Sequence, residues 1–171
     1  TLDISHNNLF GLDRSVGLRF RWGVHEQQFQ STYRQPRLFN HESLDGSGTF
    51  LVERTNRRFF EASRLELGIQ VRKRLSPTQN FLTTASYETV NLQDIKLNPI
   101  VRRFPDLKGI YHIARVGTEF VNDGRDDVLD PNHGVFHASK FQIASRTWGS
   151  EVNFLSLFQQ ASVYRKTGIG T

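Results

Sequence analysis

Acidic residues gather at one place in the chain, the stretch 124–134, where Asp126, Asp127 and Asp130 follow Arg125. Three carboxylates so close together could bind calcium, but their spacing does not match the EF-hand loop. Asp and Asn side chains also accept hydrogen bonds from nearby backbone, and proline presets φ in turns. We therefore expect a turn that caps its own backbone and pairs with Arg125. The turn motif comprises Gly124, Arg125, Asp126, Asp127, Pro131 and Gly134.

Histidines, serines and glycines are also present, but not at the spacing that a metal site, a catalytic nucleophile or a phosphate-binding loop requires. The six histidines are His6, His25, His41, His112, His133 and His137. Of these, His133 and His137 are four apart, which suits a metal site on a helix, but here they fall in a turn and a strand. Serines occur without a G-x-S-x-G elbow, and no helix start follows the glycines at 46–48. We predict no metal, no cofactor and no enzymatic activity.

The composition favours a wall of strands over a thick core. The 171 residues are 37% hydrophobic and 12% aromatic, with no cysteine. The length suits a single domain, and the missing cysteines exclude a disulfide framework and a thiolate metal site. The net charge is +5, but Lys and Arg are spread along the strands. A nucleic-acid site would need them clustered on one element, so we expect no nucleic-acid partner.

The positions around this turn alternate between apolar and polar residues with a period of two, which is typical of β-strands. About eight such segments follow a short strand tail, and their short connections imply antiparallel pairing. Several are longer than the roughly 5–6 residues usual for strands in soluble proteins. A tilted strand that crosses a membrane needs about 9–11 residues, and these segments are long enough. The expected strands are 16–24, 29–35, 44–54, 64–75, 81–92, 109–121, 135–146 and 152–166.

Each strand then has two faces, and in a transmembrane barrel the apolar face points to lipid while the polar face lines the lumen. The expected lipid-facing residues are Val16, Leu18, Phe20, Trp22, Leu65, Leu67, Ile69 and Val71. The expected lumen-facing residues are Arg19, Arg21, Arg64, Glu66, Gln70, Arg72, Arg115, Glu119, Lys140 and Arg146. Both signs of charge occur, so neighbouring strands could pair them. A soluble barrel with a wet outer face would show the same period.

Three stretches in chain order resemble one known family. Asn8-Leu9-Phe10-Gly11 with Ser15 is similar to its strand entry, and the segment 33–39 resembles its strand exit through Pro36, Arg37 and Phe39. The turn motif, the strand after it and Val152-Asn153-Phe154-Leu155 resemble a third pattern. Together they resemble the barrel of bacterial surface antigens, the BamA/TamA-type outer-membrane assembly factors. Two departures are Val128 in place of Pro and Asn132-His133 in place of Thr-Arg.

The resemblance implies an all-β, antiparallel transmembrane barrel of about 16 strands. Residues 1–171 would form a single barrel region, from the end of the second strand to the tenth. The turns at 36–44, 76–80 and 124–134 would form the periplasmic rim, and those at 25–28, 55–61, 93–108 and 147–151 would face outside. The expected location is the bacterial outer membrane. Expected partners are the lipid bilayer, client outer-membrane proteins, and accessory lipoproteins or periplasmic domains of the full-length chain.

The activity that the resemblance implies is insertion of outer-membrane proteins by pairing client strands with a strand edge, without covalent chemistry. The family's periplasmic domains, its VRGF-type loop motif and its terminal aromatic strand are missing from residues 1–171. We therefore expect a fragment of a larger barrel. Two alternatives stay open: a passive pore or two-partner secretion channel whose arginines favour anions, and a soluble barrel that binds a ligand.

Overall fold

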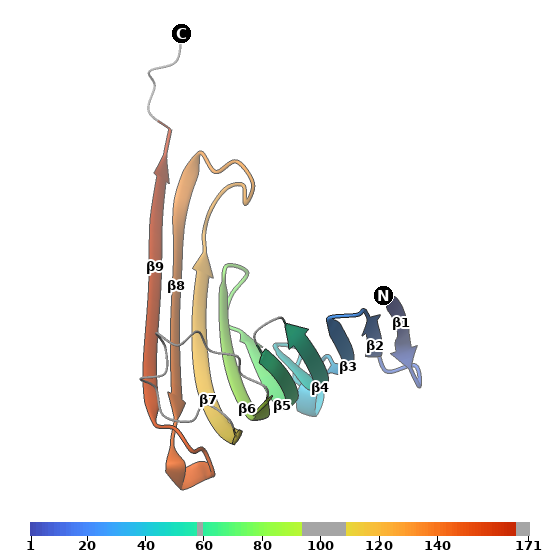
Figure 1. Ribbon diagram of the computed structural model, residues 1–171. Coiled ribbons are helices and arrows are strands. Elements are labelled where there is room, and N and C mark those ends of the chain that lie inside the picture. The colour runs from blue at the N-terminus through green and yellow to red at the C-terminus, as the bar shows by residue number, and fades with distance from the viewer. Residues whose placement is uncertain (58–59, 94–108, 167–171) are drawn as a thin grey trace.

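A computed structural model describes residues 1–57, 60–93 and 109–166. In this part of the chain, nine strands form one sheet in sequence order, and every neighbouring pair is antiparallel (Figure 1). The strands are β1 (Leu2–Leu9), β2 (Arg14–Trp22), β3 (Glu26–Gln35), β4 (Leu44–Arg57), β5 (Phe60–Arg74), β6 (Gln79–Gln93), β7 (Gly109–Asp123), β8 (His133–Ala144) and β9 (Phe154–Arg165). Two short 3-10 helices, η1 (Leu38–Asn40) and η3 (Arg146–Trp148), lie in the connections. The all-β antiparallel fold expected from the sequence is confirmed.

The strands in the middle of the sheet are longer than the sequence pattern predicts. β4 continues to Arg57 and β5 already begins at Phe60, so residues expected to form a polar tip belong to the ladder. Polar side chains that project into water do not end a strand. The backbone N–H and C=O groups of β4 and β5 can still form hydrogen bonds across the hairpin. The expected outer loop at 93–108 lies outside the described residues, except for Gln93.

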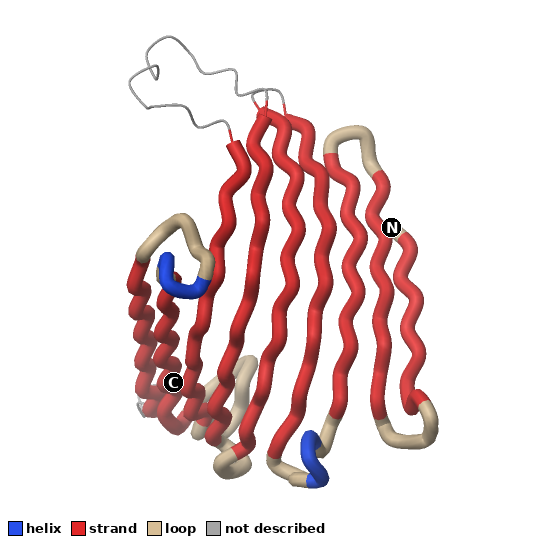
Figure 2. Tube along the Cα trace, turned by 90° about the horizontal axis from the view of Figure 1, so that it is seen from below, coloured by secondary structure: helices blue, strands red, loops and turns tan. Residues whose placement is uncertain are grey.

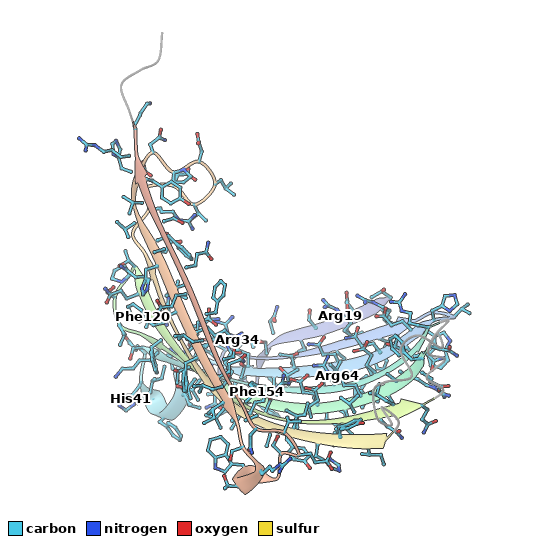
Figure 3. All side chains as sticks on the ribbon, turned by 60° about the vertical axis from the view of Figure 1, so that its left-hand side comes forward. Arg19, Arg34, His41, Arg64, Phe120 and Phe154 are labelled. Carbon is cyan, nitrogen blue, oxygen red and sulfur yellow. The ribbon has the colours of Figure 1, made fainter. Side chains whose placement is uncertain are left out.

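The sheet is curved into an open trough. Figures 2 and 3 show a single curved layer, with β1 at one edge and β9 at the other. Charged side chains such as Arg19 and Arg64 lie on the concave side, and Phe120 lies on the convex side (Figure 3). We call these the concave face and the convex face.

The sheet has no second layer to cover it in the described residues, and its apolar side chains are therefore accessible. The only buried hydrophobic residues there are Ala114 and Ala144. Opposed positions in the register share a face, and one row across the convex face is apolar throughout: Ile69, Ala85, Val116, Ile143 and Leu155. A soluble sheet would pack such a row into a core. No helix in the described residues is long and apolar enough to cross a membrane.

Candidate functional site

The concave face carries a hollow of about 550 Å³ whose charged lining comes from β5, β7 and β8. Three of its charged residues, on β5 and β7, meet a glutamate of β6 that is not part of the lining. Arg64 and Glu66 lie on β5, Glu88 on β6 and Arg115 on β7. The Arg64 Nε lies 2.8 Å from Glu88 Oε1, and the Arg115 Nη2 lies 2.5 Å from Glu88 Oε2. Arg64 also pairs with Glu66, whose other oxygen lies 3.8 Å from Arg115. These four residues form a neutral cluster, the ion-pair cluster.

The register explains why this cluster needs two arginines. Glu66 and Glu88 are directly opposite in the β5–β6 ladder, where two like charges repel. Arg64 and Arg115 lie beside them and supply the compensating charge. Glu88 is only 7% exposed, so its charge depends on these partners. The sequence analysis named the other three residues but missed Glu88, although its place in the alternation of β6 puts it on the same face.

Most of the remaining concave-face charges are also paired. Arg19 lies 2.8 Å from Asp3, and Arg21 lies 2.7 Å from Glu26. A buried carboxylate, Asp45, has Arg34 at 3.9 Å and Arg74 at 4.0 Å. The sequence analysis expected pairing between neighbouring strands, and these contacts confirm it.

The expected lumen-facing residues share this face with one exception. Paired positions place nine of them together: Arg19, Arg21, Arg64, Glu66, Gln70, Arg72, Arg115, Glu119 and Lys140. Arg146, expected to face the lumen from the strand 135–146, lies outside the sheet. β8 ends at Ala144, and Arg146 begins η3, where its Nε donates to the Glu151 carbonyl at 3.1 Å.

The expected lipid-facing residues lie together on the convex face. Val16, Leu18, Phe20 and Trp22 alternate along β2, and Leu65, Leu67, Ile69 and Val71 alternate along β5. The register connects the two sets: Leu18 is opposite Ser31, Ser31 is opposite Phe50, and Phe50 is opposite Leu67. Ring contacts continue along the row beside it, where Phe20 and Phe29 lie 4.9 Å apart.

The turn at 124–134 caps its own backbone, as its composition predicts. The Asp126 carboxylate accepts hydrogen bonds from the backbone N–H groups of Asp127, Asn132 and His133, each at 3.0 Å. The Asp127 carboxylate accepts from Leu129 at 2.7 Å and from Asp130 at 3.2 Å. These donors, led by the His133 N–H, lower the pKa of Asp126 because they stabilise its charged form.

Arg125 fastens this turn to the sheet through a partner that the sequence analysis did not name. Its guanidinium binds both carboxylate oxygens of Asp123 at 2.7 Å, and that anion raises the pKa of Arg125. The same guanidinium lies 4.9 Å from the ring centre of Phe136 and 5.9 Å from that of Tyr164. One side chain therefore connects β7, β8 and β9 at their common end. The expected pairing with a carboxylate is present, but the carboxylate belongs to β7.

Gly134 closes the turn because no other residue fits there. Its φ is +121°, and a Cβ at this position would lie 2.2 Å from the Gly124 carbonyl oxygen. Pro131 lies in the loop between these two glycines.

The strand-exit motif links two neighbouring turns. Arg37, just after Pro36, has φ +53° and forms an ion pair with Asp13 in the turn between β1 and β2. Leu38 lies against Gly46, where a Cβ would be 3.2 Å from Leu38 Cδ1. Phe39, also at positive φ, is 79% exposed. The motif therefore presents an aromatic side chain at the end of the sheet.

The described residues contain no group of three or more histidine or acidic side chains placed to hold a metal ion. His41 Nδ1 lies 2.9 Å from the Phe39 carbonyl oxygen in the connection after β3, whereas His112 and His137 contact neighbours on the sheet. His112 Nδ1 lies 3.1 Å from Thr89 Oγ1, and its ring stacks on Tyr87 at 5.9 Å. The hollow itself is lined by charged and hydroxyl-bearing side chains, among them Glu119, Lys140 and Thr84.

Comparisons with known proteins agree with this architecture. A model of the Omp85 superfamily domain matches residues 8–169. The fold is similar to the crystal structure of BamA from Haemophilus ducreyi lacking POTRA domains 1-3, with a TM-score of 0.75 and 12% sequence identity over 94% of this chain. The match covers 33% of that chain, so the present chain spans about a third of its length. The sequence matches no curated protein significantly.

The family model covers nearly the whole sequence, and the nine strands match a BamA barrel wall. The resemblance to BamA/TamA-type barrels seen in the sequence is confirmed, and this chain belongs to the Omp85 superfamily.

Proposed function

We propose that this chain forms part of the wall of an outer-membrane barrel that assembles and inserts other outer-membrane proteins. The observation that carries the proposal is the single curved sheet, with an exposed apolar convex face and an ion-paired concave face, in the arrangement of a BamA barrel. In lipid every backbone group must be paired within the protein, and a continuous antiparallel ladder does this.

In this proposal the convex face contacts lipid and the concave face lines the lumen. The lipid-facing and lumen-facing sets are those named from the sequence, without Arg146 and with Glu88 added. The turns at 36–44, 76–80 and 124–134 form the periplasmic rim of a larger barrel of about 16 strands.

The mechanism we propose involves no covalent chemistry. A client strand pairs with a strand edge of the full-length barrel, so backbone hydrogen bonds provide the binding. The proposed partners are the lipid bilayer, client outer-membrane proteins, and accessory lipoproteins or periplasmic domains of the full-length chain. The wall described here would hold the lumen open and hydrated beside that edge.

An anion-selective pore is the second candidate, and the ion pairs argue against it. Of the concave-face cations, Arg19, Arg21, Arg64 and Arg115 each lie within 4.0 Å of a carboxylate. Paired arginines contribute little net field to a lumen. A soluble ligand-binding barrel is not supported, because it would need an apolar core that the described residues lack.

The test is to reconstitute the full-length protein into lipid vesicles and measure how fast an unfolded outer-membrane client folds into them. We expect faster folding than in empty vesicles. The same protein is placed in a planar bilayer for conductance measurements. Steady ion conduction without any acceleration of client folding would refute the assembly function and favour the pore.

A further inference from the structure

We infer that the convex face has a built seat for one acyl chain of a membrane lipid, a groove across β5, β6 and β7 below Trp148. This inference rests on the proposed function, because it requires the convex face to lie in the bilayer. The groove has a volume of about 290 Å³. Its lining side chains on this face are Leu67, Ile69, Ala85, Tyr87, Ala114, Val116 and Trp148.

In the groove each of the two alanines lies opposite a larger residue, Ala85 opposite Val116 and Ala114 opposite Tyr87. Ala85 on β6 and Ala114 on β7 leave the floor low, with Leu67 and Ile69 of β5 on one side. Trp148, from the turn after β8, completes the lining. Adjacent strands are about 4.8 Å apart, so a groove that crosses three strands is about two strand spacings wide, which is room for one methylene chain.

Trp148 is held in place by the turn that carries it. The Ser145 hydroxyl accepts from the Thr147 N–H at 3.3 Å, and the Trp148 N–H donates to the Ser145 carbonyl at 3.1 Å. The turn is also bonded to β7, since the Glu151 N–H donates to the His112 carbonyl at 2.8 Å. Despite this anchoring, the indole remains 49% exposed. A wall fixed in advance lowers the entropic cost of binding.

The lining of the groove is almost entirely apolar surface, which favours an uncharged, apolar occupant. No charged side chain points into it, since Arg115 projects to the concave face, and the floor strands use their backbone groups in the ladder. A bound polypeptide would leave its own N–H and C=O groups unpaired, at a cost that a hydrocarbon chain does not incur. The groove is also continuous with the apolar row that runs to Leu155.

The experiment uses the full-length protein with fluorine-labelled tryptophan, placed in phospholipid nanodiscs. The Trp148 resonance is identified by its loss in Trp148→Phe. Lipid with a nitroxide on its acyl chain should broaden this resonance. Filling the floor with Ala85→Leu or Ala114→Leu should remove that broadening, and Ala161→Leu on the convex face of β9 should leave it unchanged. Ala85→Val is the milder substitute if a leucine prevents folding.

Two outcomes separate the failure of this inference from the failure of the proposed function. A reporter introduced by Leu157→Trp on β9 tests whether the convex face meets lipid at all. Broadening at that reporter shows that the convex face meets lipid. If the Trp148 resonance is then unaffected by lipid, or keeps its broadening when the floor is filled, the acyl-chain seat alone is overturned. If neither resonance is broadened, the convex face is not in the bilayer and the proposed function fails as well.

Discussion

Single residues decide how the turn at 124–134 keeps its shape. One carboxylate, Asp126, accepts three backbone N–H groups, whereas the side chain of Asp130 has no hydrogen bond among the described residues. The two acids are close in sequence and similar in exposure, yet only one organises the loop. They therefore make a matched pair for mutation.

We expect Asp126→Asn to loosen the turn and Asp130→Asn to leave it intact. An amide can accept fewer and weaker bonds from N–H donors than a carboxylate can. Hydrogen exchange of the backbone amides of Asn132 and His133 measures the effect. Equal exchange rates in the two variants would contradict the assigned role of Asp126.

The same carboxylate predicts a dependence on pH. The pKa of Asp126 is lower in the folded turn than the value of about 4 in an unfolded chain. Its stabilising effect is therefore complete above about pH 4 and is lost as the pH falls through the lower, folded pKa. Exchange of the His133 amide should accelerate in that acidic range, and Asp126→Asn should abolish this acceleration.

Gly134 provides a second residue-level prediction. Gly134→Ala places a Cβ against the Gly124 carbonyl at a positive φ, whereas a Cβ at Gly17 meets no atom within 4 Å. A side chain at this positive φ alone costs about 1–3 kcal/mol, and the clash adds to it. Unfolding in urea should show a loss of at least that size for Gly134→Ala and a much smaller one for Gly17→Ala. Equal losses would show that the turn can relax around a side chain.

At the scale of strands, side chains cross-link neighbours in the middle and at the end of the sheet. The ion-pair cluster joins β5, β6 and β7, and Arg125 joins β7, β8 and β9. A sheet without a second layer has few other contacts to hold its curvature. These polar cross-links therefore take over part of the role that a core has in soluble proteins.

Removing Glu88 should destabilise the sheet more than removing another concave-face acid. Glu88→Gln leaves Arg64 and Arg115 facing each other with only Glu66 between them. Breaking a fully buried pair costs about 3–5 kcal/mol, and the partial exposure of these arginines reduces our expectation to about 2 kcal/mol. Glu119→Gln is the control, since it has no ion pair in the described residues. Urea unfolding measures the free energy of unfolding of both variants. Equal losses in the two variants would show that the cluster is only a surface feature.

At the scale of the whole molecule, the two faces of the trough meet different solvents under the proposed function. Neighbouring residues of one strand then differ sharply, because alternate side chains point to opposite faces. Ile69 belongs to the convex apolar row, and Gln70 lines the concave hollow. Under the proposed function, the described wall would therefore separate lipid from a wet lumen.

Spin labels at these two positions test the partition. The 171 residues contain no cysteine, so Ile69→Cys and Gln70→Cys each create one attachment point in this part of the chain. In nanodiscs we expect the label at 69 to be accessible to oxygen, which dissolves in lipid, and the label at 70 to a water-soluble relaxant. Water exposure at position 69 would contradict the membrane orientation.

The sequence by itself determined the strands and their faces, because a period of two is a local property that each strand carries alone. It also determined the self-capping of the turn at 124–134, since Asp126 bonds to backbone within a few residues of it. Only the tertiary structure decided which charges meet. Glu88 lies 24 residues from Arg64 and 27 from Arg115, and the register that joins them depends on three strands together. The seat below Trp148 likewise required the turn after β8 to fold back onto β7, a contact between segments that no local pattern encodes.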